Sequence, residues 1–304
     1  MIPEIDLKAA LSGDRGALAQ MRVAAEDIGF LTVKNTAVSA ADVEIALRAY
    51  ATFFKLPASV KQSVDMAQTG ANRGWGASQA EQVDPESNPD YKQVFDCGFE
   101  LAKDDPLRQS GLGVYAPNQW PQGMSEFKQA ITGYYDQALT VSAQILQLLA
   151  QAIGEDADFF TDKFDKPMAL LRGNYYPPRP AWAGNKDFGI AEHTDYGCLT
   201  LLATDGVPGL EVKLRDGRWI PVNATPGTFI VNFGEMLQMW TEGRVVATSH
   251  RVIGSKEERL SIPMFYNPNY STNVAPKGSD QVILAGEHLT RRFDETYVHL
   301  QSGT

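Results

Sequence analysis

Three side chains that commonly bind transition metals lie in the second half of the chain, and two of them are almost adjacent. His193 and Asp195 are separated by one residue in the segment AEHTDYGCLTLL. On an extended strand, residues i and i+2 point to the same face, so both side chains can reach one ion. Taken alone, the pair is more typical of a hydrogen-bonded pair at a strand end. A metal site therefore requires a third ligand elsewhere.

The candidate third ligand is His250, which follows Asp195 by 55 residues (250 − 195) in the β-rich segment VVATSHRVI. A barrel can bring this strand back beside the first one. Two histidines and one carboxylate on one face of a metal leave three positions open, which is the arrangement of non-heme Fe(II) oxygenases. A closed structural zinc site would need four ligands, usually including cysteines, and the sequence has no suitably spaced pair.

A candidate anion-binding pair follows His250 closely. Arg259 and Ser261, in the segment RLSIPMFYN, are again two residues apart and face the same way on a strand. A planar guanidinium binds a carboxylate through two hydrogen bonds, and a neighbouring hydroxyl can add another. An arginine that points into a small barrel needs an anion as its partner, because an unpaired buried charge is very costly. The alternatives for Arg259 are a surface position or an ion pair within the protein.

The composition is that of an ordinary folded protein. The chain has 304 residues, of which 43% are apolar and 21% are charged, so it can bury a sizeable core. Its formal net charge of −10 argues against a nucleic-acid partner. The sequence contains no run of 18 apolar residues, so we expect no membrane span. No protein partner is evident.

The cysteine count and the first residues bear on the location of the protein. Two cysteines are too few for a disulfide framework, which favours a reducing compartment. The segment MIPEIDLKAALSGDRG has neither the basic nor the apolar region of a signal peptide. We therefore expect a cytoplasmic protein.

The first half of the sequence predicts helices. One alanine-rich helix ends at Gly29, and a second begins at the N-cap Ser39 and stops before Pro57. The longest predicted helix carries an apolar stripe and runs from a cap at Ser125 to Gly154. Its length is sufficient to brace one whole face of a domain.

Short strands dominate the remainder. Residues 66–124 are rich in Gly, Asn, Asp and Pro and predict long loops with short strands, including one within 91–99. After Pro167 the predicted strands are ALLRGNYY, CLTLLAT, LEVKL, WIPVN, TFIVNFG, VVATSHRVI and RLSIPMFYN. This cadence is typical of an all-β barrel or jelly roll. Helices followed by a run of strands indicate an α+β fold with helices outside a β core.

Taken together, the two metal-binding segments and the Arg-x-Ser pair resemble the iron(II)- and 2-oxoglutarate-dependent dioxygenases of the isopenicillin N synthase-like group. The resemblance extends over nearly the whole chain. IPEIDL is similar to the family's opening strand, EDIGFLTVKN to its first helix and strand, and RGNYYPP to its Asn-x-Tyr strand. RLSIPMFYNPN is the most specific stretch.

The resemblance implies a double-stranded β-helix (jelly-roll) core with N-terminal and bracing helices. Residues 1–124 would form a helical and loop region like the N-terminal region of non-heme dioxygenases. Residues 125–304 would form the bracing helix and the Fe(II)/2-oxoglutarate dioxygenase core, with both regions packed as one globular unit.

The resemblance also implies the chemistry. Fe(II) would be bound by His193, Asp195 and His250, with 2-oxoglutarate as co-substrate and O2 as oxidant. The enzyme would oxidise a small-molecule substrate, with hydroxylation as the leading outcome, and would release succinate and CO2. No further catalytic residue is implied beyond the iron centre.

Four residues match positions that bind 2-oxoglutarate in the family. Its distal carboxylate is held by the residues that match Arg259 and Ser261, often with the tyrosine that matches Tyr176. Asn174 matches a residue that commonly lines the same site.

The substrate pocket is less well defined by sequence. Arg172 lies two residues before Asn174 and is a candidate to bind a substrate anion, while Phe95 and Phe233 are candidates to line the pocket. The two remaining histidines, His288 and His299, lie in a polar C-terminal segment and are expected on the surface.

Two alternatives to the dioxygenase remain open at the level of sequence. The first is an Fe(II) oxidase of the same fold that does not consume 2-oxoglutarate and closes a ring, as isopenicillin N synthase does. The second is a non-catalytic barrel that binds a metal or a small molecule. The sequence does not identify the substrate, the outcome of the oxidation, the oligomeric state or the pathway.

Overall fold

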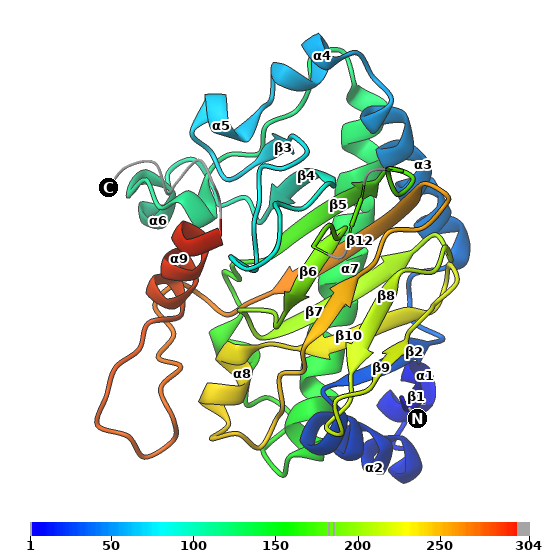
Figure 1. Cartoon of the computed structure of the whole chain (residues 1–304). Helices are drawn as coiled ribbons and strands as arrows, with labels where there is room; N and C mark the ends of the chain where they lie inside the picture. Colours follow the sequence, from blue (N-terminus) through cyan, green and yellow to red (C-terminus); the bar gives the residue numbers. More distant parts are fainter. Residues whose placement is uncertain (1, 182, 185, 297–304) are drawn as a thin grey trace.

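The computed structural model describes residues 2–181, 183–184 and 186–296 of the chain. Within them, the first four strands precede residue 124 and the others follow residue 167 (Figure 1). The strands are Glu4–Asp6 (β1), Phe30–Lys34 (β2), Gly74–Gly76 (β3), Gln93–Gly98 (β4), Leu170–Tyr176 (β5), Ile190–His193 (β6), Leu199–Thr204 (β7), Leu210–Lys213 (β8), Trp219–Pro221 (β9), Phe229–Phe233 (β10), His250–Val252 (β11) and Arg259–Tyr266 (β12).

The strands form two sheets. The larger sheet has the order β1-β2-β10-β7-β12-β5-β4-β3, and the smaller has the order β6-β11-β8-β9. Strands that are distant in sequence are therefore neighbours, as the crossing connections of a jelly roll require. The predicted α+β fold with a double-stranded β-helix core is confirmed.

Helices cover one face of the larger sheet and one end of the molecule. They are Leu7–Leu11 (α1), Arg15–Val23 (α2), Ala40–Phe54 (α3), Ala58–Gln62 (α4), Met66–Thr69 (α5), Pro106–Gln109 (α6), Ser125–Ala152 (α7), Glu235–Trp240 (α8) and Ala285–Thr296 (α9). A π-helical turn, Ala24–Ile28 (η1), and two 3₁₀ turns, Gly113–Tyr115 (η2) and Thr161–Lys163 (η3), complete the set.

Local capping explains where several helices begin and end. Ser39 caps α3 and forms a reciprocal capping box with Asp42, as its position before the apolar pattern predicts. Gly29 adopts φ 75° after η1, a left-handed conformation that favours glycine, and ends the first helical segment. The predicted cap at Ser125 is wrong, because Ser125 is the first helical residue of α7 and the preceding Met124 offers no side-chain cap.

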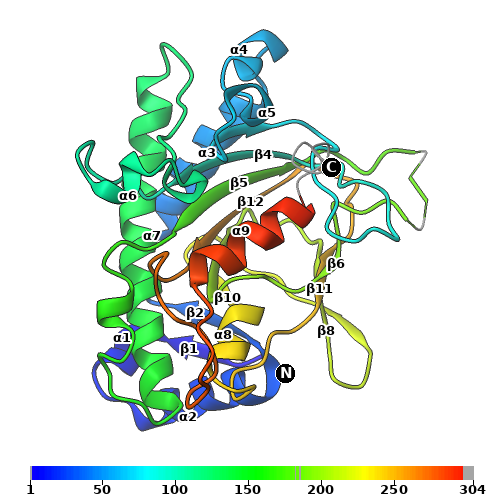
Figure 2. The same cartoon turned by 90° about the vertical axis from the view of Figure 1, so that its left-hand side faces the viewer.

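The long helix α7 braces the larger sheet. Figure 2 shows α7 on one face of this sheet and the smaller sheet on the other. The buried stripe of α7 includes Phe127, Ile131 and Ile145, and burial of each such side chain contributes about 1.5–3 kcal/mol relative to exposure. Although α7 is long, neither it nor any other described helix is apolar enough over a sufficient length to cross a membrane.

The N-terminal region contributes to both edges of the larger sheet. Strand β2 pairs with β10 and carries β1, while β4 pairs with β5 and carries β3. The strand expected within residues 91–99 is confirmed as β4. Because β5 lies next to β4, side chains of the N-terminal region face the same interior as those of the core strands.

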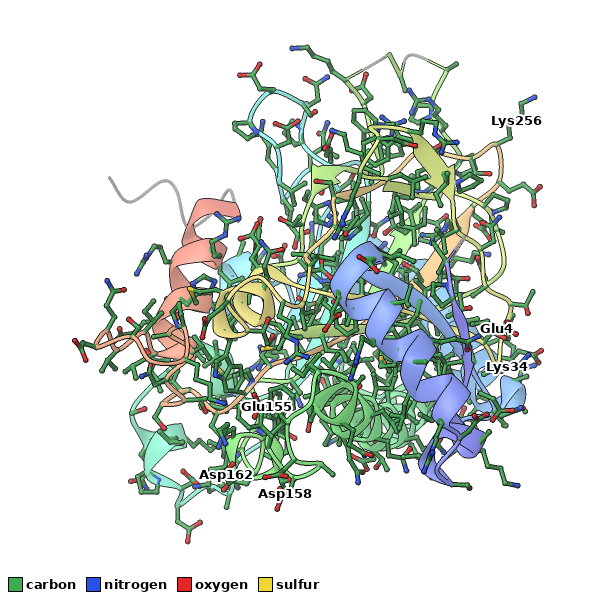
Figure 3. All side chains as sticks on the ribbon, turned by 90° about the horizontal axis from the view of Figure 1, so that it is seen from below. Glu4, Lys34, Glu155, Asp158, Asp162 and Lys256 are labelled. Atoms are coloured by element: carbon green, nitrogen blue, oxygen red, sulfur yellow. The ribbon has the colours of Figure 1, made fainter. Side chains whose placement is uncertain are left out.

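The charged surface is separate from this interior. Figure 3 places Asp158, Asp162 and Lys256 at the periphery of the molecule, together with Glu4 and Lys34, while Glu155 is half-buried. Lys34 and Glu4 form an exposed ion pair between β2 and β1. Exposed pairs of this kind contribute at most about 1 kcal/mol each. The exposed charges therefore contribute little to the stability of the fold. The charges that bear on function are the buried ones.

We expect Gly173→Ala to destabilise the protein. A Cβ atom at Gly173 in β5 would lie 2.3 Å from Cδ1 and Cε1 of Tyr50, whose fully buried ring packs between Phe54 and Phe127. Because the ring has no room to move, the overpacking should cost about 1–3 kcal/mol in the free energy of unfolding, measured by denaturant titration.

Gly133→Ala provides the matched control. Gly133 is an exposed residue within α7, and a Cβ there meets nothing within 4 Å. Alanine loses less backbone entropy than glycine when the helix forms, so this variant should stabilise the protein by about 0.5–1 kcal/mol. Equal stability of the two variants would contradict the tight contact between Tyr50 and β5.

Candidate active site

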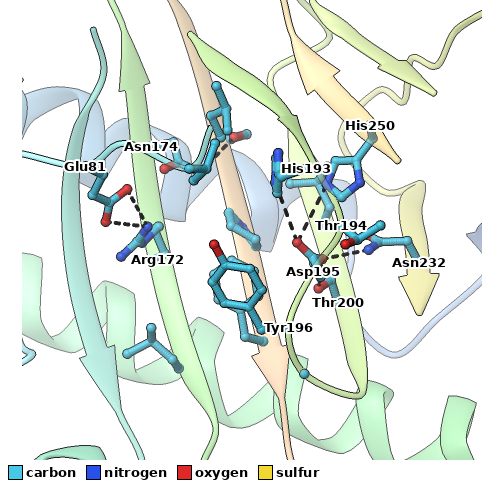
Figure 4. Close-up of a pocket in the computed structure, with 18 of the residues that line it drawn as sticks. Glu81, Arg172, Asn174, His193, Thr194, Asp195, Tyr196, Thr200, Asn232 and His250 are labelled. Atoms are coloured by element: carbon cyan, nitrogen blue, oxygen red, sulfur yellow. Dashed lines mark hydrogen bonds and ion pairs between the residues drawn. The ribbon is translucent and has the colours of Figure 1, made fainter. Parts of the chain in front are cut away.

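The antiparallel pairing of β6 and β11 places two histidines directly opposite each other. His250 is the cross-strand partner of His193, and their ring centroids lie 4.3 Å apart. Asp195 lies in the turn just beyond β6, and not on the strand itself as the sequence spacing suggested. Its Oδ1 lies 3.8 Å from His193 Nε2 and 3.6 Å from His250 Nε2 (Figure 4). The three ligand atoms lie within 4.8 Å of one another, which suits one metal ion.

Backbone carbonyls orient both imidazoles. His193 Nδ1 lies 2.8 Å from the carbonyl oxygen of Ala191, and His250 Nδ1 lies 3.2 Å from that of Thr248. A carbonyl only accepts, so each Nδ1 carries the proton and each Nε2 keeps a lone pair for the ion. Such partners fix the tautomer and the ring orientation of metal-binding histidines.

The carboxylate of Asp195 is held from the opposite side. Its Oδ2 accepts a hydrogen bond of 2.6 Å from Asn232 Nδ2 in β10 and another from the hydroxyl of Thr200 in β7. These two donors occupy Oδ2 and leave Oδ1 directed toward the histidines. The turn after β6 therefore presents one carboxylate oxygen in a fixed direction.

The protonation states of the triad suit metal binding. Burial and the nearby charge of His250 lower the pKa of His193 to about 4. Burial raises the pKa of Asp195, but His250, His193 and the two hydrogen-bond donors outweigh it and hold the pKa below its ordinary value. At neutral pH, His193 is therefore neutral and Asp195 is ionised. These are the forms in which imidazole and carboxylate bind a metal.

A buried guanidinium lies at the end of the same pocket. Arg259, at the start of β12, is 3% exposed. Its Nε donates to the carbonyl of Val207 at 3.2 Å, and its guanidinium carbon lies 5.0 Å from the centroid of the Tyr176 ring. In the described part of the chain Arg259 forms no ion pair, and its Nη1 has no hydrogen-bond partner. A buried cation of this kind requires an anionic ligand.

The other residues of this end are fixed by strand register. Tyr176 is the cross-strand partner of Arg259, and Asn174 is the partner of Ser261. Asn174 Nδ2 donates to Ser261 Oγ at 3.4 Å, while its Oδ1 is buried without a hydrogen-bond partner among the described residues. Two adjacent cross-strand pairs thus bring together the four residues that sequence linked to 2-oxoglutarate.

The pocket has a third charged region, on the wall away from the triad. Figure 4 shows Glu81 and Arg172 on one side of the pocket and the triad on the other. Arg172 in β5 pairs with Asp96 in β4 through two hydrogen bonds, of 2.8 Å from Nε and 2.7 Å from Nη2. Its Nη1 lies 2.8 Å from Glu81 Oε1. The hypothesis that Arg172 binds a substrate anion is therefore corrected, because protein carboxylates already pair with it.

Lys92 extends this charged region. Its ammonium group lies 2.7 Å from a carboxylate oxygen of Glu81 and 2.7 Å from one of Asp90. Burial alone would raise the pKa of Glu81, but Arg172 and Lys92 lower it to about 2. Burial alone would lower the pKa of Lys92, but the carboxylates of Asp90 and Glu81 outweigh it and raise that pKa. Glu81 and Lys92 are therefore both charged, although both are buried.

Two predicted pocket residues are part of the core. Phe95 is fully buried in an aromatic cluster and packs 4.7 Å from the ring of Phe53 and 5.0 Å from that of Phe127. Phe233 is 1% exposed and belongs to the same hydrophobic core. Neither side chain lines the pocket. Each strand presents alternate side chains to opposite faces, and these aromatics are on the core-facing side of β4 and β10.

The C-terminal helix α9 covers the mouth of the pocket. Leu289 and Phe293 of α9 line the cavity, and Figure 2 shows this helix across the opening between the sheets. Arg292 lies 3.2 Å from Glu235 and 4.3 Å from the centroid of the Tyr196 ring.

The two C-terminal histidines have different outcomes. The surface position predicted for His288 is wrong: it is half-buried in α9, and burial lowers its pKa. His299 lies outside the described residues.

Sequence reasoning missed the residues that support the triad and the charged wall. Asn232 is a polar residue within the apolar strand FIVNF, and Thr200 lies within the segment that carries the ligands, so both could have been noticed. Glu81 and Lys92 lie in a loop and at its end, where charged residues are usually exposed, and nothing in the sequence marks them as buried.

Family models match most of the chain. The model described as the N-terminal region of non-haem dioxygenases in morphine synthesis matches residues 2–123. The model described as the 2OG-Fe(II) oxygenase superfamily matches residues 167–268, which include the triad and Arg259. The chain belongs to the 2OG-Fe(II) oxygenase superfamily.

Individual relatives agree with the family. A 2-oxoglutarate-dependent dioxygenase from Didymella fabae is 31% identical, and the alignment covers 92% of this chain and 90% of the relative. The crystal structure of a full-length Neurospora crassa protein in complex with alpha-KG has a TM-score of 0.84 at 28% identity and covers 97% of this chain and 96% of that chain. The structure of JOX2 in complex with 2OG, Fe and JA has a TM-score of 0.80 at 26% identity and covers 99% and 88%.

The protein is therefore an Fe(II)- and 2-oxoglutarate-dependent dioxygenase that oxidises a small molecule with O2. The donor chemistry of the pocket fits both groups. Two imidazole nitrogens and one carboxylate oxygen suit Fe(II), and the unpartnered Nη1 of buried Arg259 suits the carboxylate of 2-oxoglutarate.

We expect Asn232→Ala to weaken Fe(II) binding about 10- to 100-fold, the usual effect of removing a hydrogen-bond partner of a metal ligand. The variant frees Asp195 Oδ2 from its 2.6 Å hydrogen bond, so the carboxylate can rotate away from the histidines. An anaerobic Fe(II) titration measures the change. Asn174→Ala is the matched control, since Asn174 lines the same pocket but contacts Ser261, and its iron affinity should equal that of the wild type. Wild-type iron affinity in Asn232→Ala would contradict the positioning role.

Proposed function

We propose that His193, Asp195 and His250 are the protein ligands of Fe(II). Their ligand atoms converge within 4.8 Å, and backbone carbonyls hold both Nδ1 atoms so that Nε2 is available. The 2OG-Fe(II) oxygenase family model spans all three residues. Two histidines and one carboxylate leave three positions open for a co-substrate and O2.

We propose further that Arg259 and Ser261, with Tyr176 and Asn174, hold 2-oxoglutarate. The observation that carries this proposal is the guanidinium of Arg259, which is 3% exposed and has no ion-pair partner in the described residues. The phenol ring of Tyr176 packs against this guanidinium and limits its orientation. The hydroxyl of Ser261 and the free Oδ1 of Asn174 add polar atoms beside it.

The residues of the chain divide the work of the reaction. When bound, iron and 2-oxoglutarate supply the oxidative chemistry, in which 2-oxoglutarate becomes succinate and CO2 while the substrate is oxidised. The triad fixes the coordination geometry, and Asn232 and Thr200 fix the direction of the Asp195 carboxylate. Arg259 orients 2-oxoglutarate by binding its far carboxylate. Leu289 and Phe293 of α9 exclude water from the mouth of the pocket.

This arrangement favours the dioxygenase over the two alternatives. An oxidase that does not consume 2-oxoglutarate would need a carboxylate of its own substrate to pair with the buried charge of Arg259. A non-catalytic barrel would have no need of a triad with open positions. Hydroxylation is the outcome that we propose for the substrate.

We propose that the two sequence regions, 1–124 and 125–304, act as one unit in the cytoplasm. Hydrogen-bonded strand pairs connect the regions, β2 with β10 and β4 with β5. Cys97 and Cys198 are both free thiols, and burial raises the pKa of each, so neither depends on an oxidising compartment. The buried pocket suits a small molecule, and the formal charge of −10 disfavours nucleic acid.

We expect Asp195→Ala to lose most bound iron and nearly all turnover while it remains folded. The variant removes the only carboxylate of the described triad and leaves two imidazoles, which bind Fe(II) weakly without a charged ligand. Metal analysis after anaerobic reconstitution and a succinate assay measure both effects. Full activity in the absence of added formate or halide would sink the ligand assignment.

We expect Arg259→Gln to weaken 2-oxoglutarate binding at least about thirtyfold without loss of iron. Removing one partner of a buried, hydrogen-bonded charge pair costs about 2–5 kcal/mol, and each 1.4 kcal/mol is about tenfold in affinity. Arg259→Lys should be intermediate, because it keeps the charge but loses the planar fork. Ser261→Ala removes only one hydrogen bond to a charged group, about 1.5–3 kcal/mol, and leaves the ion pair.

An anaerobic titration of 2-oxoglutarate at fixed Fe(II), followed through the metal-to-ligand charge-transfer band, compares all of these variants. If Arg259→Gln binds 2-oxoglutarate as the wild type does but loses iron, the residue has been assigned to the wrong group. Full turnover with 2-oxoglutarate rigorously removed would favour the oxidase of the same fold.

A further inference from the structure

The wall of the pocket away from the triad carries a cluster of buried charges, which we call the charged wall: Glu81, Asp90, Lys92, Asp96 and Arg172. All five residues are at most 8% exposed. Glu81, Lys92 and Arg172 line the same cavity as the triad, so a substrate that reaches the iron also faces them.

Each cation of the charged wall has carboxylate partners. Arg172 binds both oxygens of Asp96, and its Nη1 lies 2.8 Å from Glu81. Lys92 lies 2.7 Å from Glu81 and 2.7 Å from Asp90. Glu81 thus bridges the two cations. Both cations are already paired with carboxylates of the protein, and Lys92 keeps one of its three N–H donors.

The charges of this region balance. The charged wall has three carboxylates and two cations, and the buried guanidinium of Arg73 stands near Asp96 and also lines the cavity. With Arg73 included, three positive and three negative charges give a formal sum of zero. Arg73 also donates to the carbonyls of Asn72 and Val114, at 2.7 and 2.6 Å.

The charged wall is held rigidly by its backbone. Asp96 and Arg172 are cross-strand partners within the larger sheet, so their ion pair is part of the strand register. Glu81 lies in a loop whose ends are tied together, since the amide of Asp90 donates to the carbonyl of Glu81 at 2.9 Å. Displacement of Glu81 by a ligand would leave Arg172 and Lys92 to be paired again in a buried site, which is costly.

The pocket therefore treats two anions differently. Arg259 has an unpartnered Nη1 and suits the far carboxylate of 2-oxoglutarate. A second carboxylate at the charged wall would meet the oxygens of Glu81 beside cations that protein carboxylates already neutralise, and like charges at contact repel. Much of the remaining cavity lining is apolar. Its apolar side chains include Val83, Met168, Leu170, Phe265, Leu289 and Phe293.

We propose that the charged wall selects an uncharged, mainly apolar substrate with a polar group such as an amide, carbonyl or hydroxyl, and that Glu81 excludes carboxylates. Glu81 and Lys92 supply a hydrogen-bond acceptor and a donor for that polar group. The inference rests on the proposed function, because the substrate must share the pocket with Fe(II) and 2-oxoglutarate.

The test measures binding of small probes to protein loaded with Zn(II) and 2-oxoglutarate, by ligand-observed NMR titration. The probes are matched by shape and differ in charge: benzamide, benzoate and benzylamine. Phenylacetamide and phenylacetate form a second pair. We expect the wild type to bind each amide at least about tenfold more tightly than its carboxylate, the effect of a poorly screened like charge.

Two variants should change the preference in opposite directions. Glu81→Gln removes one negative charge at constant shape, so benzoate should bind at least about tenfold more tightly than to the wild type, with benzamide nearly unchanged. Lys92→Met removes one positive charge, so protonated benzylamine should gain affinity and benzoate should not. Glu86→Gln, an exposed glutamate in the same loop, is the matched control and should leave every probe unchanged.

Several outcomes would overturn the proposal. One is that benzoate binds to the wild type as tightly as benzamide does. Another is that the affinity for benzoate does not increase in Glu81→Gln, whatever the absolute affinities are. A thermal melt checks the folding of each variant, and Lys92→Met tests the same claim independently if Glu81→Gln does not fold. Loss of 2-oxoglutarate binding or of succinate release with an intact probe preference would instead contradict the proposed function, so the two failures are distinguishable.

Discussion

A charge inside a closed pocket must have a partner, and this constraint organises the whole interior of the protein. Desolvation of an ion costs several kcal/mol unless an opposite charge and hydrogen bonds replace water. The pocket contains three charged regions, and each satisfies the constraint differently. The charged wall pairs its ions internally, the ligand atoms of the triad converge on one point, and Nη1 of Arg259 has no hydrogen-bond partner among the described residues. We propose that iron and 2-oxoglutarate bind where pairing within the chain is incomplete.

Strand register converts this constraint into geometry. His250 opposite His193, Arg259 opposite Tyr176 and Ser261 opposite Asn174 are cross-strand pairs, and so are Arg172 and Asp96. A shift of one residue in any of these ladders would turn the side chains to the other face of the sheet. The apolar packing of α7 and α3 against the larger sheet therefore acts on function indirectly, because it supports the register of the three pairs in that sheet, while the His250–His193 pair lies in the smaller sheet.

The sequence predicted the structure correctly where a short motif within one element determines the position of a residue. The Arg-x-Ser spacing, the cap at Ser39 and the strand within residues 91–99 all depend on local pattern, and the structure has each of them. The His-x-Asp spacing brought both side chains to one site, although Asp195 lies beyond the end of β6. The sequence was uninformative about which face of a strand an aromatic residue occupies. Phe95 and Phe233 belong to the core because the N-terminal helices and α7 cover that side of the sheet, and this depends on tertiary packing. Burial of Glu81 and Lys92 depends on a loop that folds over the pocket, which local pattern does not encode.

The residues proposed to carry the reaction and those proposed to select the substrate come from different regions of the chain. The triad and Arg259 come from the C-terminal core, where short motifs on paired strands were readable in this sequence. Three of the five residues of the charged wall precede residue 93, and Asp96 lies on β4, so the N-terminal region supplies most of the surface away from the iron. We therefore propose that the C-terminal core supplies the oxidative chemistry, while the loop that contains Glu81 selects the molecule that reaches it.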